Sequence, residues 1–313
     1  MAEVKILDAA ATRAALPWPE LILALERDFP KGCEAPLRHQ HSFAVPNHAT
    51  GTLLLMPAWM SGAYLGVKQV CVMPDNAHYN LPSVMANYSL MNANTGALLA
   101  ILDGGELTNR RTAAASALAA KFLARKNAKN LLIVGTGGLA KNLAAAHSQV
   151  RDIEQTIYWG RDRTKTEQIH DQLSHLPGTH HIADSLESAC KQADIISCAT
   201  SSSEPLVHGA WLQSGTHLDL VGSFKPDMRE ADEQAIAISD IYVDTREGAL
   251  AEAGELSFAG QAGLFSAEDI QADLAELCAG QHQGRTRDEQ ITCFKSVGTA
   301  LEDLSAAVLA FNN

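Results

Sequence analysis

Two adjacent arginines, Arg110 and Arg111, directly precede a segment whose composition predicts a helix. Residues 112–128 are rich in Ala, Leu and Lys and contain neither Gly nor Pro, and Thr108 or Asn109 would cap such a helix. A helix start disfavours cations, because unpaired N–H groups and the helix dipole already present positive charge there. A bound carboxylate or phosphate would remove this penalty for one arginine. We therefore predict that Arg111 faces a small-anion site, whereas Arg110 is solvated at the turn.

A glycine-rich turn follows the strand-like segment 130–134. Gly135, Gly137 and Ala140 form the pattern G-x-G-x-x-A, and the helix-like segment 139–150 comes next. The first Gly makes the turn, the second lets the backbone approach a pyrophosphate, and the small third residue permits close packing of the helix, whose N-terminus faces the anion. Because the strand, the spacing and the helix agree, the sequence predicts a dinucleotide-binding site.

The end of the next strand-like segment, 155–160, indicates which dinucleotide is bound. An NAD enzyme usually carries an acidic residue here for the ribose 2′-hydroxyl, but this chain has Gly160 followed by Arg161. A guanidinium can pair with a 2′-phosphate, so the sequence favours NADPH. Asp162 leaves NADH open as the alternative cofactor.

Strand-like and helix-like patterns alternate between residues 129 and 245, with short Gly-rich connections. This alternation predicts an α/β fold with a Rossmann-type, doubly wound parallel sheet. The strand-like segments are 130–135, 155–160, 180–183, 194–200, 216–222 and 240–245, and the helix-like segments are 139–150, 164–173 and 185–193.

The remaining residues predict a second, smaller α+β domain. It opens with the helix-like segment 19–29, and the strand-like runs that follow end in a hairpin over 86–104, signalled by a turn containing Asn and Gly. The tail, 291–311, has a helical pattern consistent with packing on this domain. The predicted domains are residues 1–120 with 293–313, and residues 121–292.

Composition excludes several classes of protein. The chain has 313 residues and a formal net charge of −12, and the absence of a basic stripe argues against a nucleic-acid-binding protein. No apolar run reaches the length of a membrane span, and the first residues lack the basic and apolar regions of a signal peptide. We therefore expect a cytoplasmic protein without a membrane partner.

Neither the histidines nor the cysteines form a pattern that predicts a metal site. His39 and His41 form an H-x-H pair, but no further ligand stands nearby at a suitable spacing. The six cysteines contain no C-x-x-C pair and are predicted to be reduced. They are Cys33, Cys71, Cys190, Cys198, Cys278 and Cys293.

Seven short motifs occur in the order and approximate spacing of one family. They are PLRHQH, GVKQV, T-x-x-R-T-A-A at 108–114, GTGGLA, CAT, GSFKPDMRE and FKSVGTALEDL. Through them the chain resembles the ornithine cyclodeaminase/μ-crystallin family over nearly its whole length. The resemblance implies a homodimer, a first domain for substrate binding and dimerisation, a Rossmann domain for NAD(P), and a final helix that returns to the first domain.

The resemblance also assigns three basic residues to the substrate carboxylate: Arg38, Lys68 and Arg111. Lys68 and Arg111 would be the catalytic pair, and Arg111 would also lie near the cofactor. Each guanidinium can bind a carboxylate through two parallel hydrogen bonds, whereas Lys68 supplies a compact charge and a proton that can be transferred. Lys68 alternates with Val70 and Val72 along its strand, so we expect it to point inward. The other implied positions are Ser83, Gly138, Leu139, Thr200, Val221, Gly222 and Ser296 for the cofactor and Val297 for the substrate.

One segment departs from the pattern of a true ornithine cyclodeaminase. Such an enzyme carries an Asp in a G-x-D-x-P segment, where it assists cyclisation and loss of ammonia. In this chain the segment is 222–226, and Phe224, which cannot transfer a proton, holds the Asp position. Asp227 lies beyond the proline and is a poor substitute, so the departure argues against a cyclodeaminase.

The segments GSFKPDMRE, WGRD and EAGEL are most similar to the bacterial Δ1-pyrroline-2-carboxylate reductase branch of the family. We therefore predict NAD(P)H-dependent reduction of this imino acid to L-proline, and of its six-membered analogue Δ1-piperideine-2-carboxylate to L-pipecolate. Lys68, His39 or a water would protonate the imine nitrogen. The alternatives are an alanine dehydrogenase or ornithine cyclodeaminase of the same family, and a non-catalytic, crystallin-like protein that binds a small ligand.

Overall fold

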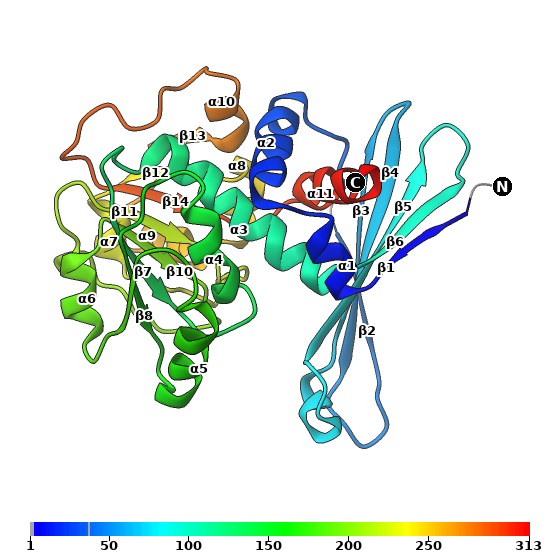
Figure 1. Ribbon diagram of the computed structural model, residues 1–313, viewed down its shortest axis with the longest axis horizontal. Helices are drawn as coiled ribbons and strands as arrows, with labels where there is room; N and C mark the ends of the chain where they lie inside the picture. Colours follow the sequence, from blue (N-terminus) through cyan, green and yellow to red (C-terminus); the bar gives the residue numbers. More distant parts are fainter. Residues whose placement is uncertain (1–2, 37) are drawn as a thin grey trace. The chain divides into compact units, whose positions relative to one another are not determined.

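The structure, a computed structural model, describes residues 3–36 and 38–313 (Figure 1). The chain forms two compact units: residues up to Arg111 together with Ala300–Asn313, and Thr112–Thr299. Helix α3, Gly104–Leu123, leads from the first unit into the second. The predicted boundaries at 120 and 293 differ from these, because the second half of α3 and a strand after residue 291 belong to the second unit.

The first unit is built on a six-stranded sheet in the order β1-β6-β5-β4-β3-β2. Strands β2 to β6 form an antiparallel meander, which includes the predicted hairpin as β5 and β6, while β1 was not predicted and pairs in parallel with β6. The strands are β1 Lys5–Leu7, β2 His39–Phe43, β3 Gly51–Met60, β4 Tyr64–Val72, β5 Val84–Asn92 and β6 Leu98–Asp103.

Helices cover one face of this sheet. Helix α11 contacts strands β3 to β6 and packs against α2 (Figure 1). The covered face includes the buried apolar residues Ala58, Leu90 and Ala100. The helical elements of this unit, apart from the start of α3, are α1 Ala9–Ala14, α2 Trp18–Asp28, η1 Phe29–Lys31, η2 Pro74–Tyr79 and α11 Ala300–Asn312.

The second unit contains an eight-stranded sheet in the order β13-β12-β14-β11-β10-β7-β8-β9. Every pairing in it is parallel, which confirms the predicted doubly wound α/β fold. The strands are β7 Asn130–Val134, β8 Gln155–Trp159, β9 Thr179–Ile182, β10 Ile195–Cys198, β11 His217–Leu220, β12 Asp240–Val243, β13 Ile270–Asp273 and β14 Thr292–Lys295.

Short helices connect these strands, and the three predicted ones, α4 to α6, are present. No helix in residues 3–36 and 38–313 is both long and apolar enough to cross a membrane. The helical elements of this unit, apart from the end of α3, are α4 Ala140–His147, α5 Arg163–Leu173, α6 Leu186–Gln192, η3 Gly209–Trp211, α7 Glu233–Ala237, α8 Arg246–Glu252, α9 Gly254–Gln261, η4 Ala267–Asp269 and α10 Leu274–Cys278.

The prediction of a wholly helical tail was wrong. Strand β14 lies between β11 and β12, all four of its residues are buried, and the final helix begins only at Ala300. Thr292 and Phe294 have the β-branched and aromatic side chains that suit a central strand. Lys295 concealed this strand in the sequence, because a lysine seldom lies wholly inside a sheet.

Helix α3 begins two turns earlier than predicted. Asp103 accepts a hydrogen bond from the Glu106 amide at 2.7 Å and thereby satisfies the helix start. Arg110 and Arg111 consequently lie in the second turn, so the argument from unpaired N–H groups at their position was wrong. Gly104 is a poor helix former, so the sequence did not predict a helix start there. Glycine is nevertheless required at this position, because a Cβ would lie only 2.7 Å from the backbone of Asn87.

Candidate functional site

Lys68 points into the first unit, as its place in the strand predicted. It lies on the same face of β4 as the buried residues Gly66 and Val70, and it is 3% exposed. Its Nζ lies 2.6 Å from Oδ2 of Asp303 on helix α11. Burial lowers the pKa of Lys68, while the Asp303 carboxylate opposes that shift.

Arg111 is buried against the same helix. Its Nε donates to Oδ1 of Asp303 at 2.9 Å, and its Nη1 donates to the carboxylate of Glu302. Burial alone would lower the pKa of Arg111, but the two carboxylates raise it above its ordinary value. The guanidinium is therefore a permanent cation, and hydrogen bonds to the two carboxylates hold its Nε and Nη1.

Lys68, Arg111, Glu302 and Asp303 form what we call the charge cluster. Burial favours the neutral form of Asp303, but Arg111 and Lys68 prevail and lower its pKa, so both cations are matched by carboxylates. Glu302 and Asp303 are each fully buried. Sequence reasoning missed both acids, although two adjacent carboxylates in the otherwise apolar segment LEDLSAAVLAF are an unusual pattern.

A tyrosine also faces the cluster and was missed by sequence reasoning. Tyr88 on β5 lies directly opposite Lys68 and is 1% exposed. No described residue accepts or donates a hydrogen bond at its hydroxyl, and burial raises its pKa well above the ordinary value. A Cβ at Gly66 would collide with this hydroxyl, so the glycine is needed where the tyrosine packs.

The strand register separates His39 from the cluster. His39 pairs with Leu55, whereas Lys68 pairs with the next residue, Met56, so the two side chains point to opposite faces of the sheet. His39 is thus wrong as a proton donor beside Lys68. Arg38 is half-buried and precedes β2 by one residue. By the alternation of side chains along the chain, it lies on the same face of the sheet as Lys68.

The glycine-rich turn in the second unit has the geometry that a pyrophosphate requires. Gly135 has φ +129°, and a Cβ on it would collide with the Ala199 carbonyl. A Cβ on Gly137 would meet nothing within 4 Å, so space is open beside that backbone. Ala140 begins α4 and is fully buried, and no side chain caps that helix at Leu139. These residues, with Gly138, fit a bound dinucleotide phosphate.

The residues after β8 lie where the sequence predicted the contact with the cofactor ribose. Asp162 caps α5 by accepting from the Lys165 amide at 3.1 Å, so its carboxylate is already engaged within the protein. Arg163 pairs with Glu167 and Asp184. Arg161 is exposed and pairs with no carboxylate in the described part of the chain.

The other predicted cofactor positions follow neighbouring strands of the parallel sheet. Thr200 comes after β10, Val221 and Gly222 after β11, and Ser296 with Val297 after β14. The carboxyl ends of parallel strands share one edge of a sheet, where ligands of this fold bind. The structure therefore places these residues at the same edge as the glycine-rich turn. Ser83 belongs instead to the first unit, in an exposed turn before β5.

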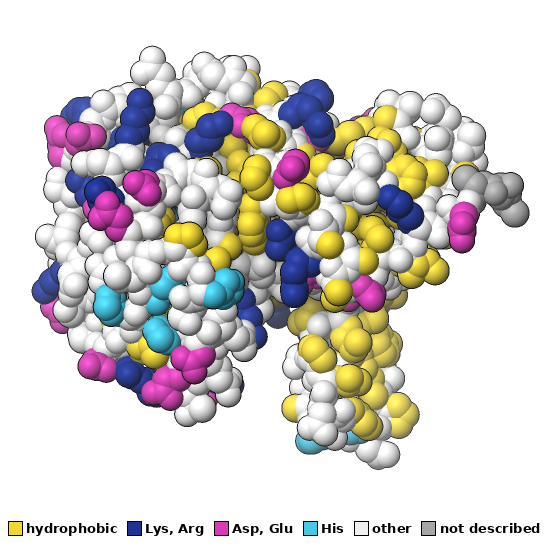
Figure 2. All heavy atoms as spheres, viewed as in Figure 1, with side chains coloured by type: hydrophobic (Ala, Val, Ile, Leu, Met, Phe, Trp, Pro, Cys, Tyr) yellow, Lys and Arg dark blue, Asp and Glu magenta, His cyan; other side chains and the backbone are white. Residues whose placement is uncertain are grey.

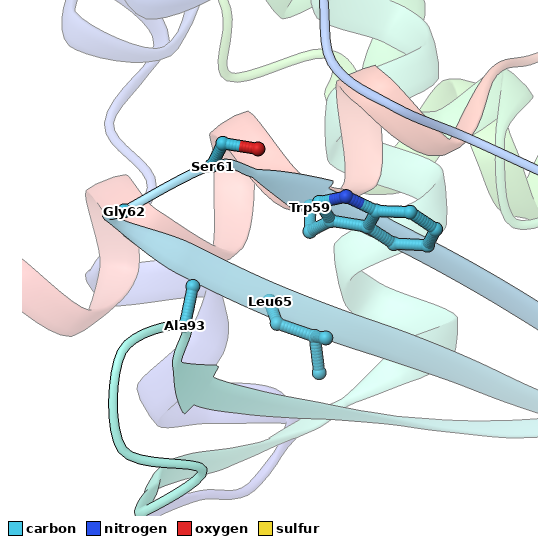
Figure 3. Close-up of a pocket in the computed structure, with 5 residues that line it drawn as sticks. All are labelled: Trp59, Ser61, Gly62, Leu65 and Ala93. Carbon is cyan, nitrogen blue, oxygen red and sulfur yellow. The ribbon is translucent and has the colours of Figure 1, made fainter.

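A shallow pocket elsewhere in the first unit carries no such chemistry. It lies at the turn between β3 and β4 and contains none of the predicted site residues (Figure 3). Its lining offers no titratable side chain, and the described residues hold no group of three or more potential metal ligands anywhere. The lining residues are Trp59, Ser61, Gly62, Leu65 and Ala93.

Comparison with known proteins identifies the family. Residues 4–313 match the model of the ornithine cyclodeaminase/mu-crystallin family. This chain belongs to that family. It is 37% identical to the Δ1-pyrroline-2-carboxylate reductase of Colwellia psychrerythraea, with 97% of each chain covered.

Solved structures of the family share the whole fold. The Δ1-pyrroline-2-carboxylate reductase of Thermococcus litoralis, in complex with NADH and L-proline, is 34% identical, with a TM-score of 0.91 over 99% of this chain and 97% of that one. An archaeal alanine dehydrogenase dimer with bound NAD is 30% identical, with a TM-score of 0.89 over 99% and 96%. The predicted family is thereby confirmed.

Arg110 supports the fold of the first unit and is not a solvated surface residue, as the sequence had suggested. It is 6% exposed, its Nε and Nη2 donate to the Leu16 carbonyl at 2.9 and 2.5 Å, and its guanidinium stacks on Trp18 at 3.8 Å. The longer helix α3 places it inside the unit, where the Leu16 carbonyl needs a donor.

We expect Arg110→Ala to lower the free energy of unfolding by about 1–3 kcal/mol, because a buried carbonyl loses its donor. Urea denaturation measures this change. Arg163→Ala is the control, since the ion pairs of Arg163 are exposed and its loss should cost no more than about 0.5 kcal/mol. Equal stabilities of the two variants would contradict the buried role of Arg110.

Proposed function

We propose that this protein reduces the C=N bond of a cyclic imino acid, using a nicotinamide cofactor. The reaction is the conversion of Δ1-pyrroline-2-carboxylate to L-proline, and of Δ1-piperideine-2-carboxylate to L-pipecolate. The observation that carries the proposal is the buried pair Lys68 and Arg111, two cations held ready for a carboxylate, in a chain similar to reductases of this substrate class over almost all of its length.

The contacts of Arg111 leave room for a substrate carboxylate. Glu302 and Asp303 occupy Nη1 and Nε, and Nη2 donates to none of the described residues. Nη2 and the remaining protons of the Lys68 ammonium would together bind the two carboxylate oxygens. Almost complete burial of both cations strengthens such contacts, because little water competes with the substrate.

The position of Arg38 in the sheet supports its assignment to the substrate carboxylate, which the family resemblance implies. By the alternation of side chains along the chain, Arg38 lies on the same face of the sheet as Lys68. Strand β2, which Arg38 precedes, lies two strand spacings from β4, roughly 10 Å. A long guanidinium side chain spans much of that distance, and we assign Arg38 to the substrate on this basis.

Lys68 is also the proposed proton donor. A bound nicotinamide cofactor supplies the hydride for C2 of the ring, and the imine nitrogen must carry a proton to accept it. Because burial lowers the pKa of Lys68, its ammonium is a better acid than that of an exposed lysine. Water remains the alternative donor. Arg111 and Arg38 would orient the ring through its carboxylate, and such positioning can contribute about 7–11 kcal/mol.

NADPH is the proposed cofactor. Asp162 is committed to the cap of α5, whereas the guanidinium of Arg161 has no carboxylate partner in the described residues. An unpaired cation after the second strand of a dinucleotide fold suits a ribose 2′-phosphate. NADH is the cofactor in the solved relative from Thermococcus litoralis, so the choice depends on Arg161.

The open face of the six-stranded sheet fits a second copy of the chain. Phe43, Met85 and Leu98 lie on this face and are 41%, 47% and 39% exposed. Figure 2 shows hydrophobic side chains gathered over strands of this unit. A broad apolar sheet face is typical of an oligomer interface, and we propose a homodimer formed through it.

The wild-type protein should oxidise NADPH or NADH in the presence of Δ1-pyrroline-2-carboxylate without added ammonia. It should release no ammonia from L-ornithine with NAD, because Phe224 has no acid to offer and is 42% exposed. A panel of cyclic imines and α-keto acids with ammonia tests both statements. Reduction that depends on ammonia would identify an alanine dehydrogenase. Formation of ammonia and proline from ornithine would identify a cyclodeaminase. Inactivity with every substrate would identify a binding protein.

Arg111→Lys should raise KM for the imino acid about 5- to 30-fold, because one charge-assisted hydrogen bond is lost while the charge that pairs with Asp303 remains. Steady-state kinetics at saturating cofactor measure the change. Arg110→Lys, on the same helix, is the matched control: it should lower stability and leave KM nearly unchanged. Equal increases in KM would refute the assignment of Arg111 to the substrate.

Arg161→Asp should weaken NADPH binding at least about tenfold more than NADH binding, since a 2′-phosphate would lose its partner and meet a like charge. Fluorescence titration with each cofactor measures the two dissociation constants. Arg163→Asp is the control, because Arg163 is already engaged by Glu167 and Asp184. A wild type that prefers NADH would show that the argument from Arg161 is wrong.

A further inference from the structure

Glu230 is a fully buried carboxylate that connects two loops at the carboxyl edge of the parallel sheet. Its Oε1 accepts from the Thr200 amide at 2.6 Å and from the Thr200 hydroxyl at 2.9 Å, and its Oε2 accepts from the Gly222 amide at 2.8 Å. Thr200 follows β10 and Gly222 follows β11. One side chain thus fixes the backbone of both loops.

The two loops pack too tightly to tolerate a side chain between them. A Cβ on Gly222 would collide with the backbone of Thr200 and would lie 2.5 Å from Oε1 of Glu230. A glycine at this position is therefore the condition for the carboxylate to reach both amides. Both loops are held by hydrogen bonds to Glu230 at their closest approach.

A second layer of charged groups holds Glu230 itself. Oε1 of Glu255, on α9, accepts from the Glu230 amide at 2.8 Å and also from the Ser223 hydroxyl at 2.6 Å. Lys295, on β14, donates to the Ser223 carbonyl at 2.7 Å and lies 3.3 Å from Oε2 of Glu255. All four side chains are at most 1% exposed.

The charges in this network are not fully balanced, because two carboxylates share one ammonium. Burial raises the pKa of Glu230 to about 7, an effect that Lys295 opposes and Glu255 increases. Such an arrangement is costly for stability alone, because a buried carboxylate beside another is unfavourable. The hydrogen bonds that Glu230 accepts from the two loops offset part of this cost.

We propose that Glu230 is a positioning residue, which holds Thr200 and Gly222 in place to line the nicotinamide cofactor. The inference rests on the proposed function, since it takes as part of the nicotinamide site two residues that the family resemblance assigns to the cofactor. Glu230 does not touch the cofactor itself, because its carboxylate is buried behind the two loops. A carboxylate suits this task, since it is an acceptor on both oxygens and can hold two sets of N–H groups at once.

Glu230→Gln tests the proposal, because an amide has one acceptor oxygen and cannot serve both loops. We expect the dissociation constant of NADPH or NADH to rise about tenfold, with kcat at saturating cofactor changed less than about twofold. Hydrogen exchange of the Thr200 or Gly222 amide should become faster in the cofactor-free protein. This second readout does not depend on catalysis.

Asp219→Asn is the matched control. Asp219 is a fully buried carboxylate of the same unit, but it accepts from the Ser116 and Ser197 hydroxyls rather than from the two loops. This variant should lose stability and keep both the cofactor affinity and the loop exchange rates of the wild type. If Glu230→Gln fails to fold, Glu255→Gln takes its place and should raise the dissociation constant in the same direction.

The outcomes separate this inference from the proposed function. If the wild type binds the cofactor and the variant matches it in affinity and in exchange, the inference is overturned and the proposed function stands. If Glu255→Gln has to replace Glu230→Gln and its affinity for the cofactor equals that of the wild type, the inference is likewise overturned. If the wild type binds neither NADPH nor NADH, both are overturned. An equal loss of affinity in Asp219→Asn would reduce Glu230 to a structural role and overturn the inference.

Discussion

The ion pairs of Asp303 are the interaction on which the first unit depends. One carboxylate forms ion pairs with Lys68 on β4 and Arg111 on α3, and it is itself carried by α11. Three elements that are distant in sequence therefore meet at a single buried group. Removal of this carboxylate would leave two buried cations without a full complement of partners, which typically costs several kcal/mol. The same contacts that hold the sheet and helices together also orient the two cations that are proposed to bind the substrate.

The second unit uses buried carboxylates in a related way. Asp244, at the end of β12, accepts at Oδ2 from the Ser296 hydroxyl and from the amides of Val297 and Gly298, at 2.7–2.9 Å. Glu230 does the same for the loops after β10 and β11. Loops at the carboxyl edge of a parallel sheet lack ladder partners of their own. The carboxylates of Glu230 and Asp244 supply hydrogen-bond acceptors for the amides of these loops.

Local patterns in the sequence predicted strands β7 to β12 and helices α4 to α6 of the second unit, because alternation, glycine spacing and strand-to-helix rhythm are properties of neighbouring residues. Strand β13 and helices α7 to α10 were not predicted. The inward direction of Lys68 followed from the period of two along its strand. Partners brought together by the fold could not be predicted in this way: Asp303 lies far from Lys68 in sequence, and the donor role of Arg110 requires knowledge of Leu16. Strand β14 was missed because its lysine finds its acceptors only inside the folded sheet.

The division of the chain has a consequence for its synthesis on the ribosome. The second unit is continuous, Thr112–Thr299, whereas the first is completed only by Ala300–Asn313. During translation Lys68 and Arg111 emerge long before the acids of α11 that neutralise them. The second unit can therefore fold while the first unit still lacks helix α11. Among the elements that form the centre proposed to bind the imino acid, α11 is therefore the last to be synthesised.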